Sequence, residues 1–353
     1  MAEGGIKGAR PKITVAGQDQ ASLAEGLLSL LVVETTQGLY RCEATFGNWG
    51  GSGGGVGFLY FDRKLLDFGK AFAVKLGSDT VFDGRVMGIE AHFPEGGSPE
   101  LTVLAEDRFQ DLRMTRRTRT FADLSDADVA RQIAGDHRLN PTVEVSGPTH
   151  KVLAQVNQSD LAFLRDRARA IDAELWVDSD QLNLKSHARR NGGTFEMSYK
   201  KELREFSVLS DLASQRTSVV VGGWDVAAKD AIKHEATASA LGSELGSDQS
   251  GASLLDTLGP RKESLAHTVP FTGEEAQAHA EAAFKTIARR FVTGRGVAEA
   301  DKRLRVGSFV DLKGLGPLYS GKYYLSEVRL HFDGARGIRN EFVAERPGLG
   351  RGQ

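Results

Sequence analysis

The chain has 353 residues, which is enough for two or three domains that each bury a core of their own. Its 45 basic and 47 acidic residues nearly cancel, so no overall field favours binding to nucleic acid or to an anionic membrane surface. The single cysteine, Cys42, excludes an internal disulfide, and we expect it to be a small buried side chain in a protein that folds in a reducing compartment.

The start of the chain and its apolar runs argue against membrane integration. Residues 1–17 lack the apolar segment of a signal peptide, and the longest apolar run, residues 27–33, is too short to span a bilayer. The 41 glycines fall mostly between apolar runs, which favours many short strands joined by tight turns.

Residues 12–108 alternate between apolar and polar positions, with Gly, Asp, Asn or Pro at most breaks. Such alternation is typical of strands with one buried face. We therefore predict an antiparallel β domain over residues 1–112. The glycine-rich stretch GGSGGGVG, residues 50–57, is expected to be a flexible loop between two of its strands.

The periodicity changes to a helical one in residues 113–192. Ser125 and Ser159 are the expected N-caps of two amphipathic helices, because each precedes a run with apolar residues three and four apart. Residues 174–187 then alternate across a polar turn, which predicts a hairpin whose Trp176 covers the helices. This segment is expected to be a small α+β insert.

Strand patterns return in residues 193–348, which we predict to be a second β domain. Residues 236–266 have no sustained period and are expected to form a long, mobile loop. An amphipathic helix is predicted at about residues 273–292, with Thr272 as its N-cap and its apolar face packed on the second β domain.

Part of the chain repeats itself, because residues 68–93 and 306–332 can be written against each other with two small gaps in the turns. This match predicts a duplicated β domain. If such a chain forms a trimer, six similar domains can face a six-fold ring while the other end keeps three-fold symmetry. The matched positions are Gly69, Val74 and Lys75 with Gly307, Leu312 and Lys313, Phe82 and Gly84 with Tyr319 and Gly321, His92 and Phe93 with His331 and Phe332, and residues 104–107 with 343–346.

The string RVGSFVDLKGLGPLYSGKYYLSEVRLHF, preceded by FVTGRG and followed by NEFVAER, resembles the phage late control protein D family. That family forms the baseplate hub of contractile tails and is similar to the hub of T4-type tails and to the N-terminal part of type VI secretion spike proteins. The resemblance runs from residue 13 to 346 and includes QSDLAFLRDRARAIDAELWV in the middle segment.

The resemblance implies an α+β, mainly β fold, in which two similar tube-protein-like antiparallel β-barrel domains flank a small α+β insert. It implies a homotrimer that joins the six-fold tail tube to a three-fold spike. Its partners would be the first tail-tube ring, a separate spike protein, other baseplate components, and a tape-measure protein or cargo. Fused spikes continue into an OB-fold and a β-helix, whereas this sequence ends at residue 353, so we expect a separate spike. The implied location is the bacterial cytoplasm during assembly and then the baseplate of a phage tail or tail-like particle.

No residue is predicted to be catalytic, cofactor-binding or metal-binding. The sequence HEATA, residues 234–238, lacks the second histidine of a zinc-protease helix, and the glycines of residues 50–57 lack the Lys-Ser/Thr of a phosphate loop. Asp126 and Asp128 fall in the first turn of a helix, where the dipole accounts for them. His92 and His331 occupy equivalent repeat positions, which favours a shared structural role.

The basic run RMTRRTRT, residues 113–120, is interpreted as a solvated connector. A contact with an acidic face of a neighbouring subunit, or a patch lining a passage for nucleic acid or cargo, is the alternative. The run has no interleaved aromatic residues and does not predict sequence-specific nucleic-acid binding.

Two other functions stay open at this point. A tail-associated enzyme that degrades the cell wall would need a cleft with paired carboxylates or a metal triad, and the sequence offers neither. A fused spike that penetrates membranes would need a β-helical extension. A structural, non-enzymatic hub is therefore the predicted function.

Overall fold

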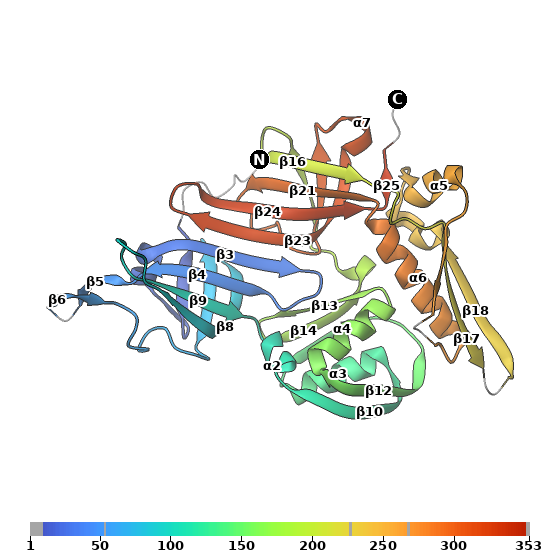
Figure 1. Cartoon of the computed structure of the whole chain (residues 1–353), viewed down its shortest axis with the longest axis horizontal. Coiled ribbons are helices and arrows are strands. Elements are labelled where there is room, and N and C mark those ends of the chain that lie inside the picture. Colours follow the sequence, from blue (N-terminus) through green and yellow to red (C-terminus); the bar gives the residue numbers. More distant parts are fainter. Residues whose placement is uncertain (1–9, 53, 226–227, 267–268, 351–353) are drawn as a thin grey trace.

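The computed structural model describes residues 10–52, 54–225, 228–266 and 269–350. The protein is a mainly β α+β protein, in which 50% of the described residues are in strands and 21% in helices, as the coarse fold class predicts. A 13-stranded sheet dominates the structure, and smaller sheets surround it. In Figure 1 the central strands of the large sheet follow one another from β16 at the top to β8 near the bottom.

The first part of the chain contributes one half of the large sheet and a short hairpin, β5–β6, beside it. Its elements are β1 (Lys12–Val15), β2 (Gln18–Asp19), α1 (Ala21–Gly26), β3 (Leu27–Thr35), β4 (Arg41–Gly47), β5 (Trp49–Ser52), β6 (Gly55–Phe58), β7 (Ala71–Leu76), β8 (Asp79–His92) and β9 (Glu100–Glu106). The strands match the predicted alternation, and every second residue of β4 is buried.

The middle segment folds as helices packed on small sheets, around a core of its own. Its elements are α2 (Phe109–Arg113), β10 (Arg116–Ser125), α3 (Asp126–Asp136), β11 (Asn140–Glu144), β12 (Thr149–Ser159), α4 (Asp160–Ala170), β13 (Ala173–Asp178), β14 (Gln181–Ser186) and η1 (His187–Arg189). The predicted N-caps are confirmed, because the hydroxyls of Ser125 and Ser159 accept hydrogen bonds from Asp128 and Ala162 backbone N–H groups.

The last part of the chain contributes the other half of the large sheet and a side layer of α6 on a three-stranded sheet. Its elements are β15 (Thr194–Ser198), β16 (Leu203–Ser210), β17 (Ser218–Asp225), β18 (Asp230–Thr237), η2 (Ala238–Glu244), β19 (Gln249–Ser250), α5 (Gly251–Leu255), η3 (Asp256–Leu258), β20 (Lys262–Leu265), α6 (Gly273–Arg289), β21 (Val292–Glu299), β22 (Phe309–Lys313), α7 (Gly316–Tyr319), β23 (Gly321–Asp333), β24 (Gly337–Arg346) and β25 (Gly348–Leu349).

The two halves of the large sheet have the same strand order. The first half reads β3-β4-β9-β8-β7-β1, and the second half reads β16-β21-β24-β23-β22-β15. They differ at the last strand, because β1 is antiparallel to β7 whereas β15 is parallel to β22. The sequence repeat is therefore a repeat of strand topology.

One part of the predicted repeat alignment was wrong. Gly84 pairs with Phe72 in β7, and the residue in the same place of the second half is Tyr323, opposite Val310. Tyr319, which the sequence match had placed against Phe82, lies in α7. The longer connection between β22 and β23 explains the error, because glycines in turns were matched by residue type and not by register.

The expected pair of separate barrels is not found in the described residues. The edge of β3 that would be free in an isolated half is occupied by β23, so the two halves merge into one open sheet. Strand pairing closes neither half on itself within those residues. Alternating patterns predict which residues form strands. They do not predict which strand pairs with an edge strand, because that depends on the tertiary structure.

Two segments expected to be loops contain regular structure. Within residues 50–57, the structure describes the paired strands of the β5–β6 hairpin, where Gly50 pairs with Gly57 and Gly51 with Val56. Residues 236–266 include η2, β19, α5, η3 and β20, and Leu241 is among the side chains that they bury. Elements this short show no periodicity of several turns, so the sequence pattern could not reveal them.

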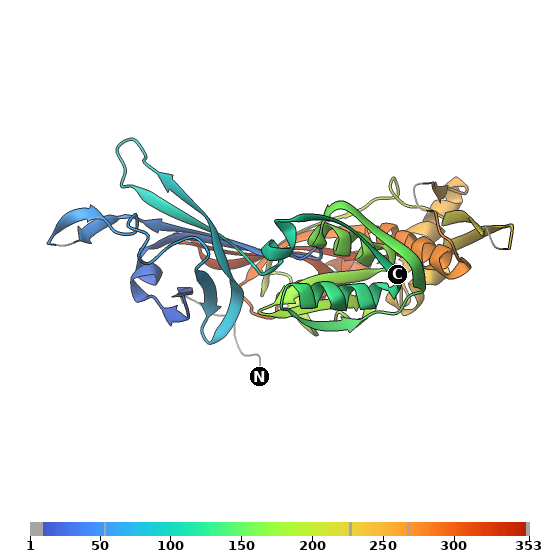
Figure 2. The same cartoon turned by 90° about the horizontal axis from the view of Figure 1, so that it is seen from below.

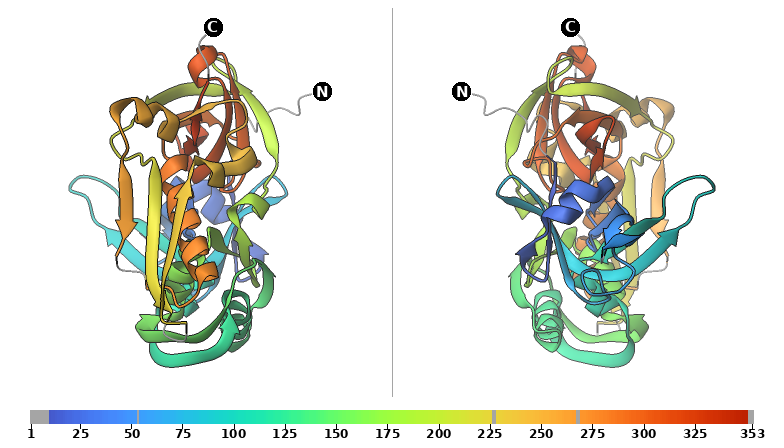
Figure 3. Two further views of the ribbon diagram at one scale, coloured as in Figure 1. Left: turned by 90° about the vertical axis from the view of Figure 1, so that its right-hand side faces the viewer. Right: turned by 90° about the vertical axis from the view of Figure 1, so that its left-hand side faces the viewer.

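The predicted amphipathic helix exists as α6 and ends at Arg289, before the residue predicted as its end. Figure 3 shows the orange ribbon of α6 beside the yellow strands β17 and β18. Its buried side chains, which include Ala280 and Phe284, pack mainly on these two strands of residues 193–348, as predicted. Trp176 differs from the prediction, because it packs against the core of the first half and under the Arg190 guanidinium.

Candidate assembly interface

The junction of the two halves is an antiparallel pairing of β3 with the second part of β23. Val32 lies opposite Leu330 and Leu30 opposite Phe332, and all four side chains are buried. These residues join the core of the first half, although Leu330 and Phe332 belong to the second half of the sheet. The junction is thus a packed interface between two copies of one strand arrangement.

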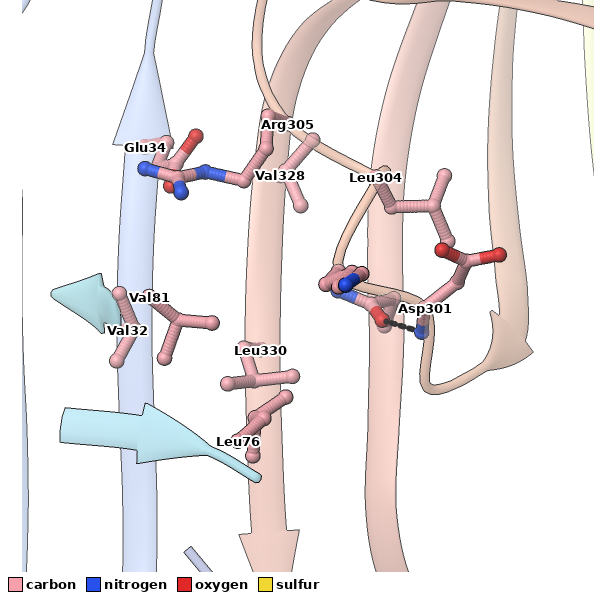
Figure 4. A pocket seen from close by; sticks show the side chains of 11 residues that line it. Val32, Glu34, Leu76, Val81, Asp301, Leu304, Arg305, Val328 and Leu330 are labelled. Carbon is pink, nitrogen blue, oxygen red and sulfur yellow. Dashed lines mark hydrogen bonds and ion pairs between the residues drawn. The ribbon is translucent and has the colours of Figure 1, made fainter. Parts of the chain in front are cut away.

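Figure 4 shows the inner side of this junction. A cavity of about 20 Å³ is lined by side chains from both halves, including Val32, Val81 and Val328. At one side Glu34 pairs with Arg305 and accepts a hydrogen bond from the Val306 N–H at 3.2 Å. Burial alone would lower the pKa of Arg305, but the charge of Glu34 raises it. The junction is therefore closed by apolar contacts and by an ion pair between the buried Glu34 and the partly exposed Arg305.

A buried polar cluster attaches the middle segment to both halves of the sheet. The Glu174 carboxylate, on β13, accepts hydrogen bonds from the Tyr324 hydroxyl at 2.6 Å and from the Arg190 guanidinium at 2.7 Å. Arg190 also donates to the Tyr40 hydroxyl at 2.7 Å, and His187 Nδ1 lies 2.8 Å from Glu174. Burial opposes ionisation of Glu174, but these partners outweigh it and lower its pKa to about 2.

A second buried cluster joins the middle segment to α6. His150 on β12 lies between two carboxylates, with Nδ1 2.5 Å from Glu275 Oε1 and Nε2 3.2 Å from Asp126 Oδ2. Arg167 donates to both carboxylate oxygens of Asp126, at 2.5 and 3.0 Å. Burial opposes the charged imidazole, but the hydrogen bond to Asp126 outweighs it and raises the pKa of His150. A doubly protonated ring donates to both carboxylates.

A third cluster lies at the other end of α6. The Arg289 guanidinium donates to Asp172 at 2.5 and 2.8 Å and to Glu244 at 2.8 Å. Asp172 follows α4, and Glu244 ends η2. The three clusters therefore join the middle segment to the large sheet and to both ends of α6.

The residues considered for chemistry are dispersed in the structure. Cys42 is fully buried in β4, where burial raises the pKa of its thiol. His234 lies in a strand, β18, opposite Val221, and so has no helical face to share with another ligand. Among the described residues, no three of His, Cys, Asp and Glu come together as a metal site.

Two features of the middle segment were missed. Residues 116–120 of the basic run form part of β10, and the connector interpretation was wrong there: Arg119 is paired with Asp160 at 2.8 Å and with Asp136 at 2.7 Å. Asp126 was assigned to the helix dipole alone, yet its buried carboxylate belongs to the His150 cluster. Partners more than 15 residues away in sequence gave no local signal.

No helix in the described part of the chain could cross a membrane.

Several strand edges are unpaired within the described residues, and two of them lie on strands that correspond to β3 and β23 in the repeated order. Apart from an isolated bridge between Leu203 and Tyr199, β16 pairs only with β21, on one side. The last part of β8, from Met87 to His92, pairs only with β9, and Figure 2 shows it extending in teal beyond the body of the molecule. Beyond it, Phe93 packs with Phe58 and Phe61, at 6.3 and 5.7 Å between ring centroids, yet remains largely exposed. Unpaired edges beside exposed apolar groups are typical of surfaces that take up another strand.

The fold is that of tail and injection-machine proteins. The structure is similar to the 43 kDa tail protein of prophage MuSo2 from Shewanella oneidensis, with TM-score 0.69, 12% identity, and 96% and 98% of the two chains covered. It is similar to a tail protein from Neisseria meningitidis MC58, with TM-score 0.67, 12% identity, and 96% and 97% covered.

A third similar structure is the E. coli c3393 protein, with TM-score 0.57, 11% identity, and 98% of this chain and 78% of that chain covered. It is described as a component of the type VI secretion system that resembles the T4 tail proteins gp27 and gp5. The similarity to tail hubs predicted from the sequence is thereby confirmed at the level of the fold.

Sequence comparison gives a family as well. None of the curated proteins matches the chain. A family model described as the Alg8 N-terminal domain matches residues 59–333, which is most of the chain and includes β7, β8 and β9 of the first half, the middle segment, and the second half except β24. The protein therefore belongs to the family of the Alg8 N-terminal domain.

Proposed function

We propose that this protein is the structural hub at the base of a phage tail or contractile injection machine. Three copies would form a ring that adapts a six-fold tail tube to a three-fold spike. The observation that carries the proposal is the repeated strand order of the large sheet, since three chains with two equivalent half-sheets each present six equivalent units.

Each segment of the chain has a separate role in this proposal. In this proposal residues 1–112 and 193–348 are the two tube-like β units that face the first tube ring, and residues 113–192 are an insert that fixes their relative orientation. The buried clusters around Glu174, His150 and Arg289 support this role, because each ties the insert to a β unit or to α6. The protein would act by assembly and mechanical support, without catalysis or a cofactor.

The partners in the proposal are a three-fold spike protein on one face, the first tail-tube ring on the other, and further baseplate components around the rim. A passage along the ring axis would admit a tape-measure protein or cargo. The supporting comparison is with proteins described as tail proteins and as a type VI secretion component, whose fold this chain shares.

The experiment measures the mass of the protein in solution by light scattering during size exclusion, with and without a candidate spike protein encoded beside it. We expect three times the chain mass of 38.1 kDa for the protein alone, or, if the trimer forms only with the spike, that mass plus the mass of the bound spike. A monomer or dimer under both conditions would contradict the proposal. Lytic activity of the purified protein that is lost when one carboxylate is changed would favour a wall-degrading enzyme instead.

A further inference from the structure

We propose that β16 of one copy of this chain pairs antiparallel with residues 88–93 of the next copy, in the register that β3 and β23 adopt inside one chain. The inference rests on the proposed ring of identical chains and names the strands that would join them. It follows from the repeat: β3 and β16 are equivalent, β23 and β8 are equivalent, and only one of the two possible pairings is made within a chain.

The equivalence of β16 with β3 extends to individual residues. Leu203 pairs with Ala298, and Glu205 with Val297, so Arg204 is a bulge. In β3, Leu27 pairs with Phe46 and Ser29 with Thr45, so Leu28 is a bulge at the same place. Because bulges mark a fixed position in a strand, they align β16 on β3 at a shift of 176 residues (Leu27 to Leu203).

The equivalence of β8 with β23 is equally close. Met87 is a bulge between Val86 and Gly88, and Ser326 is a bulge between Leu325 and Glu327. This aligns β8 on β23 at a shift of 239 residues (Val86 to Leu325). The preceding backbone hydrogen bonds agree, since Gly69 N–H donates to the Val86 carbonyl and Gly307 N–H donates to the Leu325 carbonyl. Both glycines have positive φ, 75° and 91°.

The two shifts convert the junction inside the chain into a register between chains. Inside the chain, β23 pairs with β3 as Val328 with Glu34, Arg329 with Val33, Leu330 with Val32, His331 with Leu31 and Phe332 with Leu30. Between chains, the corresponding pairs are Ile89 with Ser210, Glu90 with Leu209, Ala91 with Val208, His92 with Ser207 and Phe93 with Phe206.

Side-chain exposure supports this assignment. Phe332 is 6% exposed at the internal junction, whereas its counterpart Phe93 is 63% exposed. Val33 is 6% exposed, whereas its counterpart Leu209 is 61% exposed. The free edges therefore carry apolar side chains at the positions that the internal junction buries, as expected if each edge is covered by a second copy.

The geometry also suits closure into a ring. The two edges lie at different places in the strand order, β16 at one end of the sheet and β8 near the other, so they can join only head to tail. A head-to-tail interface closes into a ring or continues as a filament. Because it would repeat the β3–β23 junction, each step between chains would resemble the step within a chain.

The test is disulfide formation between variants that each carry one added cysteine besides Cys42. His92→Cys and Ser207→Cys, each with a different tag, are mixed and oxidised, and so are Glu90→Cys and Leu209→Cys. We expect a covalent link between differently tagged chains in both mixtures on non-reducing gels. Leu31→Cys with His331→Cys in one chain is the matched positive control, because these residues already pair within the chain.

The negative control is His92→Cys with Asp211→Cys, which shifts the partner by four residues, about 13 Å along the strand. Wild-type protein supplies a second blank, because Cys42 is fully buried. If the protein is trimeric by light scattering but the shifted mixture cross-links equally, or no mixture cross-links, the proposed register is wrong and the proposed hub is not contradicted. A chain that stays monomeric with and without the spike and links in neither mixture contradicts both.

Discussion

Glu174 lies at the centre of the polar cluster that joins the middle segment to both halves of the sheet, so its loss tests whether the insert is a rigid part of the fold. Glu174→Gln keeps the shape but leaves the buried Arg190 charge without its partner. We expect the free energy of unfolding to fall by about 3–5 kcal/mol, the usual effect of breaking a buried ion pair. Chemical denaturation measures it.

The control and the pH dependence sharpen this prediction. Replacing Glu174 and Arg190 together by Met should lower the free energy of unfolding less than Glu174→Gln alone, because no charge is left unpaired.

Since the folded-state pKa of Glu174 is lowered to about 2, the contribution of its ionised form to stability is present above pH 4.5, the ordinary pKa, and is lost as pH falls toward 2. Equal acid sensitivity of wild type and Glu174→Gln would count against this account.

His150 gives a pH dependence of the opposite sign. Its folded-state pKa is raised above the ordinary 6.5 by Asp126, so its contribution is complete below pH 6.5 and is lost as pH rises through the folded value. Glu275 and Arg167 also face the ring. We expect the Tm difference between wild type and His150→Gln to be larger at pH 6 than at pH 9.

A matched histidine change separates this effect from a general one. His234→Gln alters a histidine in β18, outside the cluster, and is the matched control at both pH values. If the wild type and His150→Gln differ by the same amount at pH 6 and pH 9, the charged pairing of His150 is not a source of stability.

Residue roles were the hardest part of the molecule to predict from the sequence. Ser125 and Ser159 could be identified as N-caps because a cap contacts residues three positions away. The roles of Asp126, Glu174 and Arg190 could not, because their partners lie on other elements and only the fold brings them together. Their sequence context is that of ordinary surface charges.

At the scale of elements, the exposed edge of β16 makes a specific prediction. Leu209→Lys should leave the stability of the isolated chain within about 0.5 kcal/mol, because the side chain is 61% exposed there. It should weaken assembly, since the lysine would be placed inside the junction between chains. Light scattering measures the loss of trimer, and a thermal melt checks the fold.

Leu258→Lys is the control for that variant. Leu258 is also 61% exposed and lies in η3, outside both free edges. It should leave assembly unchanged. Trimer formation that survives Leu209→Lys, or that is lost equally with Leu258→Lys, would show that β16 is not the joining strand.

Elements were predictable where the pattern is long and local. The alternation in β4 and β8 and the helical stripe of α6 follow from side-chain spacing alone. The pairing of β3 with β23 joins residues about 300 positions apart, and no local pattern specifies it. The same limit explains why two separate barrels were expected where one continuous sheet is found.

For the whole molecule, the central claim is that one strand arrangement occurs twice, so that three chains give six equivalent units. The sequence pointed to this through Gly69, His92 and their counterparts, which the strand registers place at equivalent positions. It misaligned the turn between β22 and β23, since insertions there leave no strand pattern to follow.

Electron cryo-microscopy of the purified assembly tests this claim most directly. We predict a ring of three copies around a three-fold axis. The six half-sheets, two from each chain, should follow one another around the ring at nearly equal rotations. Two half-sheets of each chain at different radii or heights, or a ring with a copy number other than three, would contradict the account.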